Sequence, residues 1–84
     1  MPEDKIVMYG ADWCSDTRRA KRFFEQRDIP YKWVDIQSNR EGQNFVKEVN
    51  GGKSIIPTIV FTDGSILVEP SNAELTEKVD SQDP

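Results

Sequence analysis

Apolar residues form short runs separated by polar stretches, and their spacing predicts alternating strands and helices. Ile6 to Tyr9 is an uninterrupted apolar run ended by a glycine, which predicts a buried strand. Residues 12–27 predict a helix, because apolar residues recur three to four positions apart, as on one helical face. That face carries Thr17, Ala20, Phe23 and Phe24. Residues 31–36 alternate around Trp33 and predict a second strand.

Capping signals mark both ends of a second predicted helix. Ser38 and Glu41 have the spacing of a capping box, so the helix is expected to start near Ser38. Asn50-Gly51-Gly52 supplies a left-handed stop at its end. Its apolar side is formed by Phe45, Val46 and Val49.

The chain then returns to strands. Residues 55–61 are rich in apolar side chains and predict a third strand whose entry is bent at Pro57. Asp63-Gly64 is a typical hairpin turn, so residues 65–68 are expected to pair antiparallel with the third strand.

A last helix is predicted to open at Pro70-Ser71, where Ser71 and Glu74 again have capping-box spacing. Its apolar residues are Leu75 and Val79, and the polar residues after Val79 are expected to fray. The predicted elements therefore follow in the order β-α-β-α-β-β-α.

This order predicts an α/β fold. The two early strand–helix–strand units are expected to give parallel neighbouring strands, and the late hairpin supplies antiparallel ones. A mixed four-stranded sheet with helices on both faces satisfies both requirements. With 84 residues, the chain 1–84 is expected to form a single small domain, with its core over about residues 5–79 and a polar C-terminal tail.

Composition narrows the classes of function. Eleven basic and fifteen acidic residues give a net charge of −4, which argues against a general nucleic-acid binder. The first residues lack a signal peptide's basic and apolar regions, and the longest apolar run is far too short to span a membrane. We therefore expect a cytoplasmic monomer without nucleic-acid or membrane partners.

The inventory of reactive side chains leaves one candidate nucleophile. The sequence has no histidine, which excludes Ser-His-Asp and Cys-His catalysis and histidine-ligated metals. Cys14 is the single cysteine, so no internal disulfide and no thiolate cage can form, and no metal site is expected. Cys14 follows the first strand at the start of the first helix, where unpaired amides favour a thiolate.

The residues after Cys14 are expected to decide how readily its thiol ionises. A helix dipole contributes only about 0.3–1 kcal/mol at an exposed site, so direct hydrogen bonds must add to it. The candidates are the Thr17 hydroxyl and the amides of Asp16 and Thr17. The Asp16 carboxylate opposes a second negative charge nearby, and the arginines that follow offset it only in part. A lone cysteine can also be a small buried apolar residue.

Pro57 strengthens the functional interpretation. It precedes the β-branched stretch Thr58-Ile59-Val60, and a proline at such a strand entry is a candidate for a cis peptide bond. The alternative is an ordinary strand-entry proline, which is commoner, and only the combination with Cys14 favours the cis interpretation. We expect the Ile56–Pro57 bond to be cis and to lie against Cys14.

These motifs resemble the glutaredoxin family. Residues 9–17, Tyr-Gly-Ala-Asp-Trp-Cys-Ser-Asp-Thr, are similar to its strand-to-helix active-site turn, and Ile55–Thr58 is similar to its cis-proline loop. The further matches resemble mycoredoxins, actinobacterial glutaredoxin-like proteins that act on mycothiol mixed disulfides; they lie at residues 34–36, 39–40, 45–46, 49–52, 61–65 and 69–71. The resemblance covers about residues 5–79 and implies a thioredoxin-like fold.

The resemblance also implies roles for individual residues. Cys14 would be the nucleophile, and Ile56-Pro57 a backbone platform for the bound disulfide. The neighbours of the thiol ligand would be Trp13, Ser71 and Asn72.

The sequence departs from the family in its active-site turn. Two-thiol members carry a second cysteine where this chain has Thr17, and the lysine of many glutathione-using members is matched by Ala11. The Cys-Gly-Phe-Ser signature of cluster-binding members is absent too. The chain therefore resembles a monothiol oxidoreductase that reduces mixed disulfides between thiolated or oxidised proteins and a small thiol, mycothiol or glutathione, without a bound cofactor. The alternative is a redox-silent binding module with a vestigial cysteine, which Asp16 favours.

Overall fold

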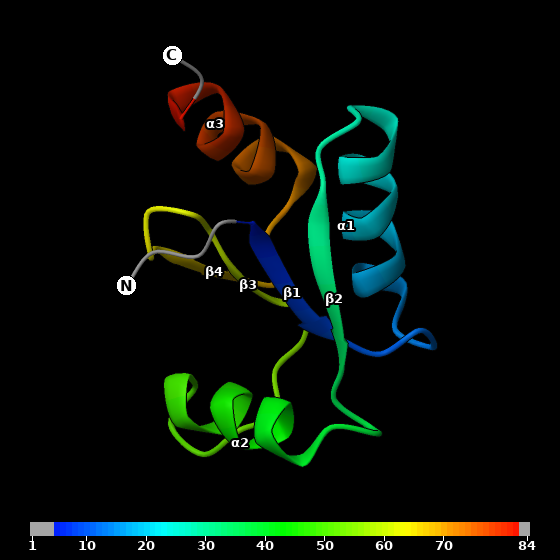
Figure 1. Cartoon of the computed structure of the whole chain (residues 1–84), viewed down its shortest axis with the longest axis vertical. Helices are drawn as coiled ribbons and strands as arrows, with labels where there is room; N and C mark the ends of the chain where they lie inside the picture. Colours follow the sequence, from blue (N-terminus) through cyan, green and yellow to red (C-terminus); the bar gives the residue numbers. More distant parts are fainter. Residues whose placement is uncertain (1–4, 83–84) are drawn as a thin grey trace.

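The computed structural model describes residues 5–82, and within them the predicted order of elements is confirmed (Figure 1). The elements are β1 (Ile6–Gly10), α1 (Ser15–Gln26), β2 (Tyr31–Asp35), α2 (Arg40–Val49), β3 (Thr58–Val60), β4 (Ile66–Val68) and α3 (Asn72–Gln82).

The strands form one mixed four-stranded sheet in the order β2-β1-β3-β4. β1 pairs parallel with β2, whereas β3 is antiparallel to both β1 and β4. The mixed sheet and the hairpin are therefore confirmed. The expectation that the second strand–helix–strand unit would also give parallel neighbours is wrong.

The position of α2 explains the direction of β3. α2 lies across the end of the sheet at which β1 and β2 finish (Figure 1). In the register of β1 and β3, Tyr9 near the end of β1 faces Thr58 at the start of β3. Because the chain leaves α2 at this end of the sheet, it enters β3 there and runs back alongside β1.

Apolar side chains alternate between the two faces of the sheet, and helices cover both. One cluster joins the sheet to α1 and α3; its buried members are Ile6, Met8, Ala20, Phe23, Phe24, Ile59, Phe61 and Leu75. The other cluster lies on the α2 side; its buried members are Ala11, Ile36, Val46 and Ile56. Tyr9 stacks on Phe45 of α2 on that second face, with ring centroids 4.7 Å apart.

Two helices begin later than the sequence predicts. α1 begins at Ser15 instead of residue 12, because Cys14 has extended backbone angles and its amide donates to the Ala11 carbonyl at 3.1 Å. α2 is capped by Asn39, whose side chain accepts from the Gly42 amide at 2.7 Å, so the capping box at Ser38 is wrong. Asparagine is as good a cap as serine, and Asn39 has the extended conformation that a cap requires.

The other boundaries follow their turn chemistry. Gly51 and Gly52 have φ angles of +67° and +95°, which confirms the left-handed stop after α2. Gly64 in the hairpin turn has φ +89°. β3 is shorter than expected, because residues 55–57 form a loop that leads into it.

At α3, the capping box is confirmed by reciprocal bonds between Ser71 and Glu74: the Ser71 amide donates to Glu74 at 2.8 Å, and the Glu74 amide donates to Ser71 at 3.1 Å. The residues after Val79 do not fray at once, since α3 runs on to Gln82. Residues 83–84 of the predicted tail lie outside the described residues.

Asp63 ties the hairpin turn to α3 and is expected to make stability depend on acid pH. Its carboxylate accepts from Lys78 Nζ at 2.8 Å and from the amide and hydroxyl of Ser65, which together hold the pKa of Asp63 well below its usual range. A carboxyl whose pKa is lower in the folded chain stabilises the fold fully above about pH 4, and this contribution is lost as the pH falls. Asp63→Asn should therefore flatten the acid side of the stability curve.

Urea unfolding between pH 2 and pH 7 measures this effect. The control is Asp80→Asn, which changes an exposed carboxyl of α3, the helix that Lys78 belongs to. The interpretation is wrong if Asp63→Asn and Asp80→Asn show the same dependence on pH.

Candidate functional site

Cys14 caps the N-terminus of α1, at the point where the chain leaves β1. Its carbonyl accepts from the Arg18 amide at 3.0 Å, the first hydrogen bond of the helix. The side chain is half-buried and packs against the apolar cluster on the α2 side of the sheet. The only cysteine therefore lies where β1, α1 and α2 meet.

The loop before β3 reaches the same cluster. The Ile56–Pro57 bond is cis, as predicted. Ile56 belongs to the cluster against which Cys14 packs, and the Pro57 side chain is fully buried. The Pro57 carbonyl accepts from the Glu69 amide at 2.8 Å, which ties this loop to the segment leading into α3. Close contact between Pro57 itself and the sulfur stays a prediction.

The Thr17 hydroxyl does not donate the hydrogen bond to the Cys14 sulfur that the sequence predicts. Its side chain is fully buried, and its Oγ1 has no hydrogen-bond partner among residues 5–82. No amide of the first turn donates to the Cys14 side chain either. The expected hydrogen bonds to the sulfur are therefore not formed.

The packing of the two side chains explains why Thr17 does not bond to the Cys14 sulfur. The Thr17 side chain lies on the backbone of Gly10: a Cβ placed on Gly10 would lie 2.7 Å from both Cγ2 and Oγ1 of Thr17. Cys14, in contrast, packs against the apolar cluster on the α2 side of the sheet.

Asp16 is compensated more directly than the sequence predicts. Its Oδ1 accepts from Nη1 of Arg19 at 3.0 Å, while Nη2 of the same arginine reaches the Pro70 carbonyl at 3.3 Å. Arg18 forms no ion pair with Asp16, since its side chain donates to the Asp12 carbonyl. The i,i+3 spacing of Asp16 and Arg19 is the sequence signal that indicates this ion pair.

Removing Arg19 should slow the reaction of the Cys14 thiol at low salt. Arg19→Ala exposes the thiol to the uncompensated Asp16 carboxylate, so alkylation by iodoacetamide at neutral pH should slow by about two- to fivefold. The deficit should disappear in 0.5 M salt and in the Asp16→Asn background. A deficit that persists in Arg19→Ala/Asp16→Asn would show that Arg19 acts through its bond to Pro70 instead.

The residues that the resemblance places around the ligand are brought together in part. Trp13 is 65% exposed beside Cys14. The Arg19–Pro70 bond brings the segment before Ser71 to α1, while the Ser71 hydroxyl accepts from the Glu74 amide. Asn72 is the first residue of α3 and is exposed.

Residues 5–82 offer neither a cluster of metal ligands nor a membrane-spanning helix. No group of three or more histidine, cysteine, aspartate or glutamate side chains is placed there to hold a metal ion. Within the same range, every helix is too short or too polar to cross a bilayer.

Comparison with known proteins decides the family. The glutaredoxin family model matches residues 6–66, which include β1, α1, β2, α2 and β3. The chain belongs to the glutaredoxin family. A provisionally named glutaredoxin of Mycobacterium tuberculosis strain H37Rv is 39% identical to this glutaredoxin over 74 residues, 88% of each chain. Mycoredoxin 1 of Corynebacterium glutamicum is 29% identical over 76 residues, covering 90% of this chain and 94% of its own.

Solved structures support the same fold. The thioredoxin-like protein BC3987 superposes with a TM-score of 0.75 at 22% identity, over 87% of this glutaredoxin and 97% of that chain. A glutaredoxin from Archaeoglobus fulgidus superposes with a TM-score of 0.71 at 19% identity, over 89% and 85%. At such low identity these matches show the fold alone: it is thioredoxin-like.

Proposed function

We propose that this glutaredoxin is a monothiol oxidoreductase that reduces mixed disulfides between proteins and a small thiol. The observation that carries the proposal is the position of Cys14: a half-exposed thiol at a helix N-terminus, in one cluster with the loop of the cis Ile56–Pro57 bond. Because Thr17 occupies the place of a second thiol, the reaction must proceed without a resolving cysteine.

The reaction balances over two exchanges. The Cys14 thiolate attacks the small-thiol sulfur of the mixed disulfide, a Cys14–small thiol bond forms, and the substrate protein leaves as a thiolate that takes up a proton. A second small-thiol molecule, as its thiolate, then attacks this new bond, which frees Cys14 and yields the small-thiol disulfide. The small thiol, mycothiol or glutathione, is thus a co-substrate and not a bound cofactor.

We assign supporting roles to the surrounding residues. Ile56 and Pro57 would present backbone to the bound disulfide, while Trp13, Ser71 and Asn72 would contact the thiol ligand. Residues 5–79 would act as one monomeric domain in the cytoplasm, with thiolated or oxidised proteins as partners. Asp16, held by Arg19, would modulate the thiolate.

Thr17 would donate a hydrogen bond to the sulfur once Cys14 is ionised. Its hydroxyl is buried and unpartnered in this state, so a donor is available one turn from the thiol. Thr17→Val removes the hydroxyl but keeps the shape of the side chain. We expect the free energy of unfolding to rise by about 1 kcal/mol, because an unsatisfied buried group is lost, while disulfide exchange slows only in part.

Two readouts check this prediction: urea unfolding, and reaction with 2,2′-dithiodipyridine, a small neutral disulfide. Thr17→Ser, which keeps the hydroxyl, is the control and should retain the exchange rate. Unchanged exchange in Thr17→Val would remove Thr17 from the mechanism.

The competing function is a redox-silent binding module, and the absence of hydrogen bonds to the sulfur favours it. The pH dependence of Cys14 alkylation separates the two. A working oxidoreductase should show a thiol that is already reactive near neutral pH, whereas an unactivated cysteine reacts appreciably only above about pH 8.5.

A further inference from the structure

A line of cations leads away from Cys14 along α1. Cys14, Arg18 and Arg22 are spaced four residues apart, and the bond from the Arg18 amide to the Cys14 carbonyl places Arg18 one turn beyond the thiol. Both arginines are exposed. They border a shallow hollow of about 330 Å³, whose lining residues are Asp12, Arg18, Lys21, Arg22 and Glu25.

The carboxylates next to the thiol do not cancel this charge. Asp12 is paired with Lys21 at 2.9 Å, and Asp16 is paired with Arg19 at 3.0 Å. Arg18 donates to a neutral backbone carbonyl, so its charge is retained. The one carboxylate left in the hollow is Glu25, at the end remote from Cys14, where it accepts from the Tyr31 hydroxyl. The thiol end of α1 is therefore net positive in a chain of charge −4.

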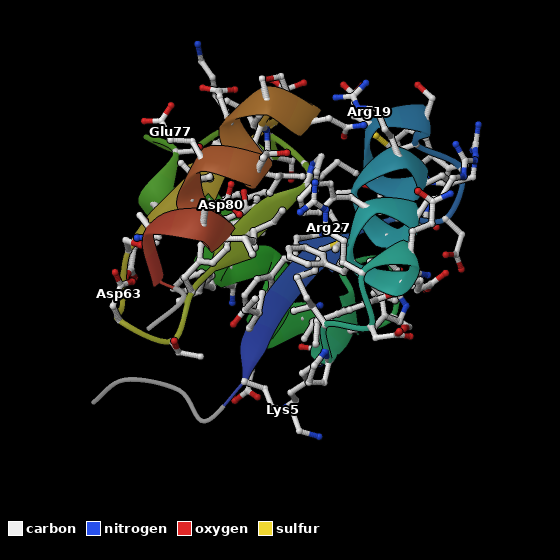
Figure 2. The ribbon with its side chains drawn as sticks, turned by 90° about the horizontal axis from the view of Figure 1, so that it is seen from above. Lys5, Arg19, Arg27, Asp63, Glu77 and Asp80 are labelled. Carbon is white, nitrogen blue, oxygen red and sulfur yellow. The ribbon has the colours of Figure 1, made fainter. Side chains whose placement is uncertain are left out.

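The opposite charge gathers on α3. α1 contains four basic and two acidic residues, whereas α3 contains one basic and three acidic residues. In Figure 2, Arg19 and Arg27 lie on the α1 side, whereas Glu77 and Asp80 lie on α3. A charged partner would therefore be drawn to one side of the thiol in preference to the other.

An apolar anchor stands beside the cations. Trp13 is 65% exposed and directly precedes Cys14. Exposed tryptophan and arginine are the residue types that most often carry the binding energy of protein interfaces. A tryptophan at the thiol followed by two arginines suits a peptide segment better than a small thiol alone.

We propose that the Arg18–Arg22 face of α1 is a docking surface for substrate proteins that carry acidic residues close to their disulfide. This inference rests on the proposed oxidoreductase function. Along the helix axis, Arg18 lies about 6 Å and Arg22 about 12 Å from Cys14. An extended substrate advances about 3.3 Å per residue. The acidic residues should therefore lie about two to four positions from the substrate cysteine.

Synthetic peptides test this proposal. Each carries one cysteine as a mixed disulfide with 2-thiopyridine, followed at positions +2 and +4 by either two glutamates or two lysines. The Cys14 thiolate attacks the peptide sulfur, a Cys14–peptide disulfide forms, and 2-thiopyridine leaves as an anion that takes up a proton from water to give the thione, whose absorbance gives the rate. We expect the glutamate peptide to react about tenfold faster than the lysine peptide at low salt, and the ratio to approach one in 0.5 M salt.

Matched variants locate the effect. Arg18→Gln/Arg22→Gln removes two positive charges on the proposed surface while leaving a donor at each position. Lys5→Gln/Lys32→Gln removes the same charge from the opposite end of the sheet, where both lysines are exposed. The ratio of the glutamate-peptide rate to the lysine-peptide rate should fall close to one in the first variant and stay near tenfold in the second. Loss of the preference in both variants would mean that net charge alone steers the peptides, which would overturn the proposal.

The results distinguish a failure of the docking surface from a failure of the proposed oxidoreductase function. If the unchanged protein releases the small thiol from a glutathionylated test protein but treats both peptides alike, the docking surface is wrong and the oxidoreductase stands. If it releases no small thiol from that test protein, the oxidoreductase itself is wrong, and the docking surface falls with it.

Discussion

Replacing Cys14 by serine is expected to abolish thiol–disulfide exchange. Cys14 is the only sulfur in the sequence able to act as a nucleophile, since the methionines carry thioethers. A serine hydroxyl is not ionised near neutral pH, and the sequence has no histidine to activate it. The rate at which a glutathionylated or mycothiolated test protein releases its small thiol should fall to the uncatalysed background.

The serine variant should remain folded, because the Cys14 side chain makes no capping hydrogen bond and is only half-buried. Circular dichroism and urea unfolding provide that check. Exchange above background in folded Cys14→Ser protein would refute every step assigned to the thiol.

Replacing Gly10 by alanine is expected to have the largest effect on stability. A Cβ at Gly10 would lie 2.7 Å from both Cγ2 and Oγ1 of Thr17, and Thr17 is fully buried in the first turn of α1. Neither group can give way unless the start of the helix moves. Overpacking of this kind costs about 1–3 kcal/mol. Because Cys14 caps the same turn, disulfide exchange should slow as well.

Rescue at Thr17 tests the cause. In Gly10→Ala/Thr17→Ala both crowding atoms are removed, so the double variant should be less destabilised than the sum of the two single changes, by about 1 kcal/mol. Gly42→Ala is the control, because its Cβ would lie 2.7 Å from Val34 instead. If Thr17→Ala relieved Gly42→Ala equally, or failed to relieve Gly10→Ala, the direct contact would not be the cause.

Most of the fold could be predicted from the sequence because its signals are local. Apolar periodicity marks α1, and Asp63-Gly64 and Gly51-Gly52 determine turns whose backbone few other residues adopt. The direction of β3 could not be predicted in this way. It depends on where α2 packs, and α2 crosses the end of the sheet instead of running back along it (Figure 1).

The candidate site shows the same division. The position of Cys14 at a helix N-terminus and the cis bond before Pro57 follow from neighbouring residues. The direction in which each side chain points does not follow from its neighbours in the sequence. Thr17 turns onto Gly10, a contact between two elements. The Asp16–Arg19 pair is local, but the second bond of Arg19 reaches Pro70, far along the chain, and therefore depends on tertiary structure.

We expect Cys14 to take the small thiol from a mixed disulfide onto itself, and intact-mass measurement follows this transfer. The reduced protein is mixed with a test protein that carries one small thiol as a mixed disulfide, and the reaction is quenched by acid at intervals. The mass of the small thiol should move from the test protein to this chain, whereas Cys14→Ser protein should gain nothing. A test protein that keeps its small thiol, or a small thiol released without ever being carried on Cys14, would show that Cys14 is not the carrier.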